Sequence, residues 1–237
     1  MNRPFIIFLF LAPAILARAD DSLERDRAKA ILRDMQSTST WYHDDLFGQF
    51  AGFRYYAQHR YADALHYFEL GAYYADKPSQ ISVGLMYLKG EGVTGDPATA
   101  LAWIELASER GYPAYIATRD RVKATLTPHE LTRAKEVHEK LAEKYGDAVA
   151  KPRIAEELRA GLRLMTGSHA GFDAGAQFLP LEAIYPEHTS APGSMDVRTI
   201  CPHGFWAAEC WKPELYFAMR DRQLNATVTV GPVQGQK

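Results

Sequence analysis

The sequence predicts an all-α protein made of repeated helical hairpins, followed by an irregular C-terminal extension. Two observations support this prediction. Between Asp44 and Tyr145, apolar residues recur at helical spacing with short connections and almost no strand pattern. Two stretches of this region also repeat one pattern at a nearly fixed offset. The formal net charge of -2 over 237 residues gives no long-range attraction to nucleic acid, so a nucleic-acid partner is not expected.

Residues 1–19 have the pattern of a secretory signal peptide. Arg3 provides a positive start, Phe5 to Leu16 are apolar, and Ala17-Arg18-Ala19 matches a cleavage site. The apolar run is shorter than the about 20 residues that a transmembrane helix needs. We therefore expect cleavage after Ala19, no stable membrane span, and export to the periplasm or the medium. An uncleaved anchor is the alternative.

Residues 20–43 are interpreted as an N-terminal helix, Ser22 to Met35, followed by a polar linker. The linker leads into Trp41-Tyr42-His43-Asp44-Asp45, where one histidine precedes two carboxylates. Such a cluster could hold a metal or transfer a proton, but adjacent side chains rarely converge on one point. The preferred interpretation is that Asp44 or Asp45 caps the next helix.

The segment from Ser79 to Gly111 predicts a helix, a loop, a second helix and a stop. Gly90-Glu91-Gly92 ends the first helix, which starts at Ser79. Asp96-Pro97 starts the second helix, because Asp96 can cap it and proline fits its first turn. Gly111 follows Arg110 as the stop. The loop lacks the Lys-Ser/Thr pair of a phosphate-binding loop, so its glycines are interpreted as turn residues.

An earlier stretch, starting at Ala51, repeats this pattern. Its first helix matches at an offset of 32 residues and its second at 36, so the length difference is confined to the loop. The matching pairs are Gly52 with Gly84, Tyr55 with Tyr87, Ala64-Leu65 with Ala100-Leu101, and Tyr67 with Trp103. Tyr112 to Lys123 is interpreted as the first helix of a third, incomplete unit.

The hairpins are followed by a closing helix. Thr127 and Glu130 form a predicted capping box at the start of a long amphipathic helix that reaches Tyr145. A terminal helix of this kind shields the last repeat from water. Another helix is expected to begin at Lys151-Pro152. The predicted repeat region therefore covers residues 44–150, and the C-terminal helix and extension cover 151–237.

The extension contains both cysteines of the chain. Cys201 and Cys210 lie nine positions apart, which predicts a disulfide in an exported protein; a metal site with His203 is the alternative. A short helix is expected from Pro213 and a short strand over residues 226–233. Whether the extension forms an ordered cap or a separate module is left open by the sequence.

The second hairpin resembles the Sel-one-like repeat, an α/α unit related to the tetratricopeptide repeat. The resemblance covers about residues 44–145 and implies a right-handed α/α solenoid whose concave face holds protein partners. Exported members of the family are similar to bacterial envelope adaptors, and some resemble toxin-immunity proteins. The residues that carry it are Gly84-Leu85-Met86-Tyr87, Gly90-Glu91-Gly92-Val93, Asp96, Ala100-Leu101, Trp103, Ala107 and Gly111.

The sequence therefore favours a non-enzymatic, exported protein-binding module without a cofactor, a metal or catalytic residues. Aromatic residues are concentrated near the start of the predicted repeats, and Tyr and Trp are frequent in binding hot spots. The predicted partner-binding residues are Trp41, Tyr42, Tyr55, Tyr56, His59 and Tyr87. The alternative is an envelope hydrolase, or an enzyme accessory, with its site in the extension. Its candidate residues are Asp196, His203, Glu209 and Glu214.

Overall fold

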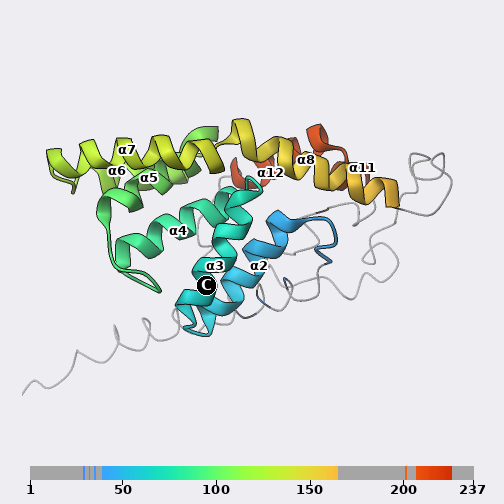
Figure 1. Cartoon of the computed structure of the whole chain (residues 1–237). Helices are drawn as coiled ribbons and strands as arrows, with labels where there is room; N and C mark the ends of the chain where they lie inside the picture. Colours follow the sequence, from blue (N-terminus) through green and yellow to red (C-terminus); the bar gives the residue numbers. More distant parts are fainter. Residues whose placement is uncertain are drawn as a thin grey trace, which may run out of the picture.

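The computed structural model describes residues 39–164 and 207–225, together with Lys29, Leu32, Met35 and Cys201. The predicted signal peptide and the expected strand at 226–233 lie outside the described residues. Within the described ranges all regular structure is helical, which confirms the all-α part of the predicted fold class. No helix there is long and apolar enough to cross a membrane. Figure 1 shows α7 and α8 following one another along one edge, with α2 and α3 on the opposite side.

The first hairpin consists of α2 (Asp44–Ala57) and α3 (Tyr61–Tyr73). Glycines let these two helices pack closely. A Cβ atom at Gly48 would lie 2.6 Å from the Cα atom of Gly71, and one at Gly52 would lie 2.6 Å from the Phe68 ring. Both distances are too short for real Cβ contacts, so the pairing of α2 with α3 depends on these positions having no side chain.

The second hairpin consists of α4 (Lys77–Lys89) and α5 (Pro97–Ala107), with a 3₁₀ turn, η1 (Ser108–Arg110), after α5. As predicted, the side chain of Asp96 caps α5 and Gly111 ends the turn, at a φ of 78°. Helix α4 begins two residues earlier than expected. Its cap is Asp76, whose carboxylate accepts a 2.8 Å hydrogen bond from the backbone N–H of Ser79.

Corresponding contacts recur in the two hairpins at the offsets found in the sequence. A Cβ atom at Gly84 would lie 2.7 Å from the side chain of Ile104, just as one at Gly52 would meet Phe68. Ala64 and Ala100 are both fully buried. Ala75 and Gly111, 36 residues apart, both have positive φ angles, of 66° and 78°.

Helices α6 (Pro113–Lys123) and α7 (Pro128–Tyr145) follow, and the capping box of Thr127 and Glu130 is present as predicted. The helix expected from Lys151-Pro152 instead begins at Asp147, as α8 (Asp147–Leu164), with Pro152 inside it. Ion pairs of Asp147 with Lys77 and Arg110 fix its first turn, and an acidic residue there suits the helix dipole. The expected boundary between residues 150 and 151 therefore falls within a helix.

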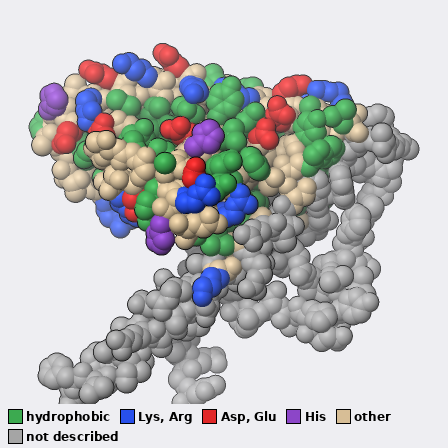
Figure 2. Space-filling model, turned by 60° about the horizontal axis from the view of Figure 1, so that its bottom comes forward, with side chains coloured by type: hydrophobic (Ala, Val, Ile, Leu, Met, Phe, Trp, Pro, Cys, Tyr) green, Lys and Arg blue, Asp and Glu red, His purple; other side chains and the backbone are tan. Residues whose placement is uncertain are grey.

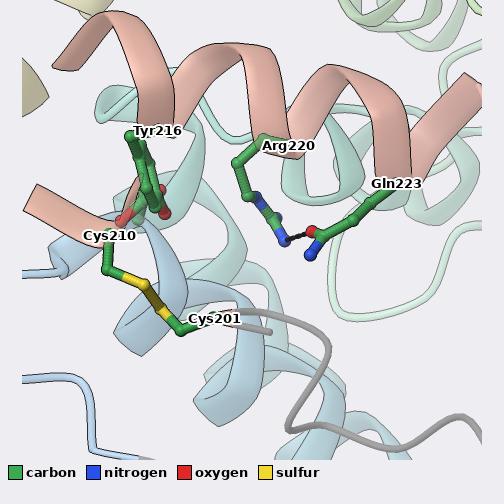
Figure 3. The surroundings of a disulfide bond; sticks show 6 residues. Cys201, Cys210, Tyr216, Arg220 and Gln223 are labelled. Atoms are coloured by element: carbon green, nitrogen blue, oxygen red, sulfur yellow. Dashed lines mark hydrogen bonds between the residues drawn. A yellow bond between two sulfur atoms is a disulfide. The ribbon is translucent and has the colours of Figure 1, made fainter. Parts of the chain in front are cut away.

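The described part of the extension packs on the preceding helices as an ordered cap. It contains α11 (Ala208–Trp211) and α12 (Pro213–Asn225), which begins at the predicted proline. Figure 1 shows both helices beside α8. One buried hydrophobic cluster joins them to it, with Ala75, Ala150, Ile154, Leu158, Cys210, Trp211, Tyr216 and Met219 as its members. Cys201 and Cys210 form the predicted disulfide, so their thiolates are not available to a metal (Figure 3).

Candidate protein-binding surface

The six predicted partner-binding residues lie in two separate places. Trp41 and Tyr42 lie beside α8 and α11, where the Trp41 ring is 5.7 Å from the Trp211 ring. Trp41 is 42% exposed, whereas Tyr42 packs against the buried cluster under α11. The remaining four residues lie near the C-terminal ends of α2 and α4. The sequence prediction therefore does not describe one continuous surface.

Three of the four residues at the second place make contacts within or between the two hairpins. The Tyr56 hydroxyl donates a 2.7 Å hydrogen bond to Glu91 in the loop between α4 and α5. The His59 Nδ1 atom lies 2.9 Å from the Tyr61 hydroxyl, and His59 itself turns the chain at a φ of 59°. Tyr87 is half-buried against the core cluster of the hairpins, and this burial raises the pKa of its hydroxyl.

Tyr55 lies at the centre of an aromatic and cationic surface on the first hairpin. Its ring stacks on the Tyr67 ring, with 5.1 Å between their centroids and 15° between their planes. The Arg60 guanidinium lies 4.5 Å from the Tyr55 centroid, and that of Arg54 lies 5.1 Å away. Phe47 is 41% exposed and contacts Tyr67 edge to face. We call these five residues, Phe47, Arg54, Tyr55, Arg60 and Tyr67, the α2–α3 surface.

A groove of about 150 Å³ borders the α2–α3 surface on its α2 side. Figure 2 shows a face of the molecule on which basic, histidine and acidic side chains gather among hydrophobic ones. Phe47 and Arg54 are seven positions apart and therefore lie on the same side of α2. Both belong to the α2–α3 surface and also line the groove. The groove is lined by Leu32, Met35, Thr40, Phe47, Phe50, Ala51 and Arg54.

Sequence reasoning identified only Tyr55 in the α2–α3 surface and missed its other four members. The seven-residue spacing of Phe47 and Arg54 in α2 was a usable signal, since it marks one side of a helix. The pairing of Tyr55 with Tyr67 and Arg60 had no comparable signal, because those residues come from a different helix and their register depends on the packing of α2 on α3.

The N-terminal ends of α2, α4 and α6 lie under α12. The Tyr216 hydroxyl donates a 2.5 Å hydrogen bond to Asp45 Oδ2. Arg220 donates to Asp76 at 2.8 Å and to Gln49 at 3.0 Å. Figure 3 shows Tyr216 and Arg220 extending from α12 towards the helices beneath it. Near the start of α6, Tyr112 donates a hydrogen bond to Asp221 of α12. Helix α12 therefore covers these helix ends.

The predicted capping role of Asp44 or Asp45 is wrong. His43 is the N-cap residue of α2 and makes no side-chain capping bond, while Asp45 turns into the interior towards α12. Burial raises the pKa of Asp45 from its usual 3.8 to about 6, although the nearby charge of Arg220 acts in the opposite direction. Burial, helped by the charge of Arg220, lowers the pKa of His43 to about 3.

This buried polar cluster has no space for an organic substrate. The cavity beside Asp45 has a volume of about 10 Å³, which is close to the minimum that holds one water molecule. Its walls include Asp76, Lys77, Arg110 and Tyr216. The arrangement can hold a helix in place and can exchange protons on titration, but it presents no reacting group to a bound molecule.

A second buried network joins α4, η1 and α8. Lys77 is fully buried, and its ammonium contacts Glu109 at 2.8 Å, Asp147 at 3.1 Å and the Leu106 carbonyl at 2.9 Å. Arg110 donates to both carboxylate oxygens of Asp147, at 2.7 and 2.9 Å. Each charge in this network therefore has an opposite charge within contact distance, as buried charges require.

Of the four candidate residues of the enzyme alternative, the structure describes two, and these lie on different helices. Glu209 lies half-buried on α11 and Glu214 is exposed on α12, whereas Asp196 and His203 lie outside the described residues. In the described part of the chain, no group of three His, Cys, Asp or Glu side chains is placed to hold a metal ion.

The comparisons with known proteins identify no relative. No family model, no curated protein and no solved structure matches this chain. The resemblance to the Sel-one-like repeat therefore stays a prediction.

Proposed function

We propose that this chain is a non-enzymatic protein-binding module and that its partner binds the α2–α3 surface. The observation that carries the proposal is the partly exposed Tyr55 ring, stacked on Tyr67 and flanked by the guanidinium groups of Arg54 and Arg60. Tyr and Arg are enriched in binding hot spots, because they provide contact area and directed hydrogen bonds together. Rings and cations already held in contact also lose little freedom when a partner binds.

The hairpins are proposed to form a short right-handed α/α solenoid of the Sel-one-like kind. The recurrence of the Gly52–Phe68 contact as Gly84–Ile104 supports a repeated unit. In such an array the helix ends facing one side would be open to a partner, but here α12 covers the N-terminal ends of α2 and α4. This is why the proposed binding surface is the exposed side of the first hairpin.

The chemistry of the α2–α3 surface fits an acidic partner segment that carries an apolar side chain. Arg54 makes no ion pair among the described residues, and Arg60 is 54% exposed although it pairs with Asp63. Both guanidinium groups can therefore receive carboxylates from a partner. The bordering groove, about 150 Å³ in volume, has Met35, Phe47 and Phe50 among its lining residues and can receive one aliphatic or aromatic side chain.

The proposed location of this module is the bacterial periplasm or the medium. The signal-peptide pattern of residues 1–19 supports export, and the Cys201–Cys210 disulfide is typical of an oxidising compartment. An envelope adaptor and a toxin-immunity protein are both consistent with such a module, and both would present a surface of this kind to one protein.

The proposal is tested by affinity capture from envelope extract, followed by titration of the purified partner. Wild-type chain should retain one protein in near-stoichiometric amount, and the Tyr55→Ala change should weaken its binding by about 30-fold, as loss of a hot-spot residue worth about 2 kcal/mol does. Lys135→Ala, an exposed change on α7, is the matched control and should bind as wild type does. Equal binding by Tyr55→Ala would refute the assignment of this surface.

A further inference from the structure

His43 and Asp45 lie at the start of α2 and are both enclosed by the cap formed by α11 and α12. The exposed fraction is 0% for His43 and 3% for Asp45. The His43 ring lies 4.9 Å from the Trp211 ring and 5.3 Å from the Tyr216 ring, and the same Tyr216 bonds to Asp45. Because Trp211 and Tyr216 belong to the cap, His43 loses both ring contacts and Asp45 loses its hydrogen bond when the cap comes away, and water gains access to both groups.

We propose that His43 and Asp45 form a compensating pair that keeps the cap docked with nearly constant free energy as the pH falls from about 7.5 to about 4.5. The physical basis is that one cap covers both groups. As the pH falls, His43 takes up a proton more readily in the undocked state, and Asp45 takes one up more readily in the docked state. The proposal concerns cap docking alone and does not depend on which partner the α2–α3 surface binds.

The histidine alone would make docking weaker in acid. In the docked state the pKa of His43 is about 3, whereas in water its usual value is 6.5. Undocking therefore takes up a proton at every pH between these values. That uptake favours the undocked state about tenfold more for each unit by which the pH falls below 6.5.

The aspartate alone would make docking stronger in acid. In the docked state the pKa of Asp45 is about 6, against a usual value of 3.8. Docking therefore takes up a proton between these values and becomes about tenfold more favourable per unit as the pH falls through that window. Between about pH 4 and pH 6, the docked state holds a proton on Asp45 and the undocked state holds one on His43. The two states therefore bind equal numbers of protons in this range.

Other charged groups face this pair from each neighbouring element. Arg220 of α12 opposes a proton on His43 and favours the charged form of Asp45, while Asp76 at the start of α4 acts against that charged form. Lys77 and Arg110 line the cavity beside Asp45. These groups are present in wild type and in the variants below, so their own titrations are common to both proteins and largely cancel when the two unfolding constants are divided.

The test is a set of urea unfolding curves between pH 4.5 and 7.5 on the full chain with its disulfide intact, because unfolding removes the cap and returns both groups to water. The unfolding constant of wild type, divided by that of Asp45→Asn, should fall about tenfold per unit as the pH drops from 6 to 4.5. The same ratio for His43→Phe, which keeps a ring between Trp211 and Tyr216, should rise about tenfold per unit below pH 6.5. Groups common to both proteins cancel from each ratio.

Two exposed residues provide matched controls. His129→Phe on α7 and Asp120→Asn on α6 change the same side-chain types at exposed positions away from the cap, so a slope that all four variants shared would not be assigned to the cap. Ratios for His43→Phe and Asp45→Asn that are flat, or that slope in the same direction, would overturn the proposal.

A direct measurement on wild type covers the case in which a variant does not fold. The imidazole resonances of His43, followed by NMR in the folded protein, should show no titration down to pH 4.5, because the docked cap keeps the ring neutral. Titration of His43 near pH 6.5 in the folded state would overturn the compensating pair irrespective of the variants.

Discussion

At the scale of single residues, glycines decide how closely the helices approach. Gly48 and Gly71 face each other across α2 and α3, and Gly84 faces Ile104 across α4 and α5. The backbone at these three glycines is not in the left-handed region. A side chain is excluded there because it would collide with the neighbouring helix. Gly111 is different, because its φ of 78° favours glycine while nothing within 4 Å would contact an added Cβ. Ala75 adopts the same left-handed region at the corresponding position of the first hairpin.

The change Gly48→Ala should destabilise the protein by about 3 kcal/mol, at the upper end of the usual cost of overpacking. Its Cβ atom would lie 2.7 Å from the Tyr67 carbonyl oxygen, which is backbone and cannot rotate away. The free energy of unfolding in urea is the measurement. Gly95→Ala is the control, since its nearest neighbour would lie 3.6 Å away, and it should change stability little.

At the scale of elements, the start of α8 shows tertiary contacts setting a helix boundary. The helix begins at Asp147 and runs through Pro152, although proline inside a helix removes one backbone hydrogen bond. Asp147 compensates because it receives hydrogen bonds from Arg110 and an ion pair from Lys77, both from the second hairpin. Burial disfavours the charged form of Asp147, but these cations outweigh it and hold its pKa well below the usual value.

The change Asp147→Asn should lower the free energy of unfolding at pH 7 by about 2 kcal/mol, the usual worth of a hydrogen bond to a charged group. A carboxylate with a depressed pKa stabilises the folded state above the pKa of the unfolded chain, and this contribution is lost as the pH falls below it. The difference between wild type and Asp147→Asn should therefore shrink as the pH falls below about 4.

Unfolding curves at several pH values measure this effect, with Glu156→Gln on the same helix as the control. Glu156 also pairs with an arginine, Arg163, but both side chains are about 60% exposed, so its loss should change stability little. A difference for Asp147→Asn that stays constant down to pH 2 would contradict the assigned role of the ion pairs.

At the scale of the whole molecule, the C-terminal cap joins parts of the chain that are far apart in sequence. Tyr216 and Arg220 of α12 bond to Asp45, Gln49 and Asp76, and Trp211 of α11 packs on α8 beside Gly161. The disulfide ties Cys201, which packs near Leu46 and Phe50, to the buried Cys210. Removing the cap would expose the apolar side of α8, so the helices beneath it depend on the extension.

Loss of the disulfide should destabilise the protein by roughly 2–3 kcal/mol, the cost expected for so short a closed loop in the chain-entropy treatment. The measurement compares urea unfolding of wild type with and without a reducing agent. The double variant Cys201→Ala, Cys210→Ala should match reduced wild type and show no response to the reductant. A wild-type protein equally stable in both conditions would contradict the role of the disulfide in fixing the cap.

The sequence by itself determined the helical fold class, the helix–loop–helix course of the second hairpin, the capping box at Thr127 and the disulfide. These features are local: caps, glycine stops and apolar periodicity act within a few residues, and they leave direct signals in the chain. The repeat offsets were also readable, because corresponding contacts need corresponding residue types. Tyr55 was predicted as a binding residue from its residue type and its place among the clustered aromatic residues, and that role stays a prediction.

Only the tertiary structure decided the start of α8, the burial of His43 and Asp45, the partners of Tyr55, and the position of α12 over the ends of α2 and α4. Each of these depends on contacts between residues distant in sequence. Asp45 could cap a helix or enter a buried cluster, and its neighbours in the chain are the same in both cases. The choice was made by α12, about 170 residues later, where the Tyr216 hydroxyl donates a hydrogen bond to Asp45 and the charge of Arg220 lies nearby.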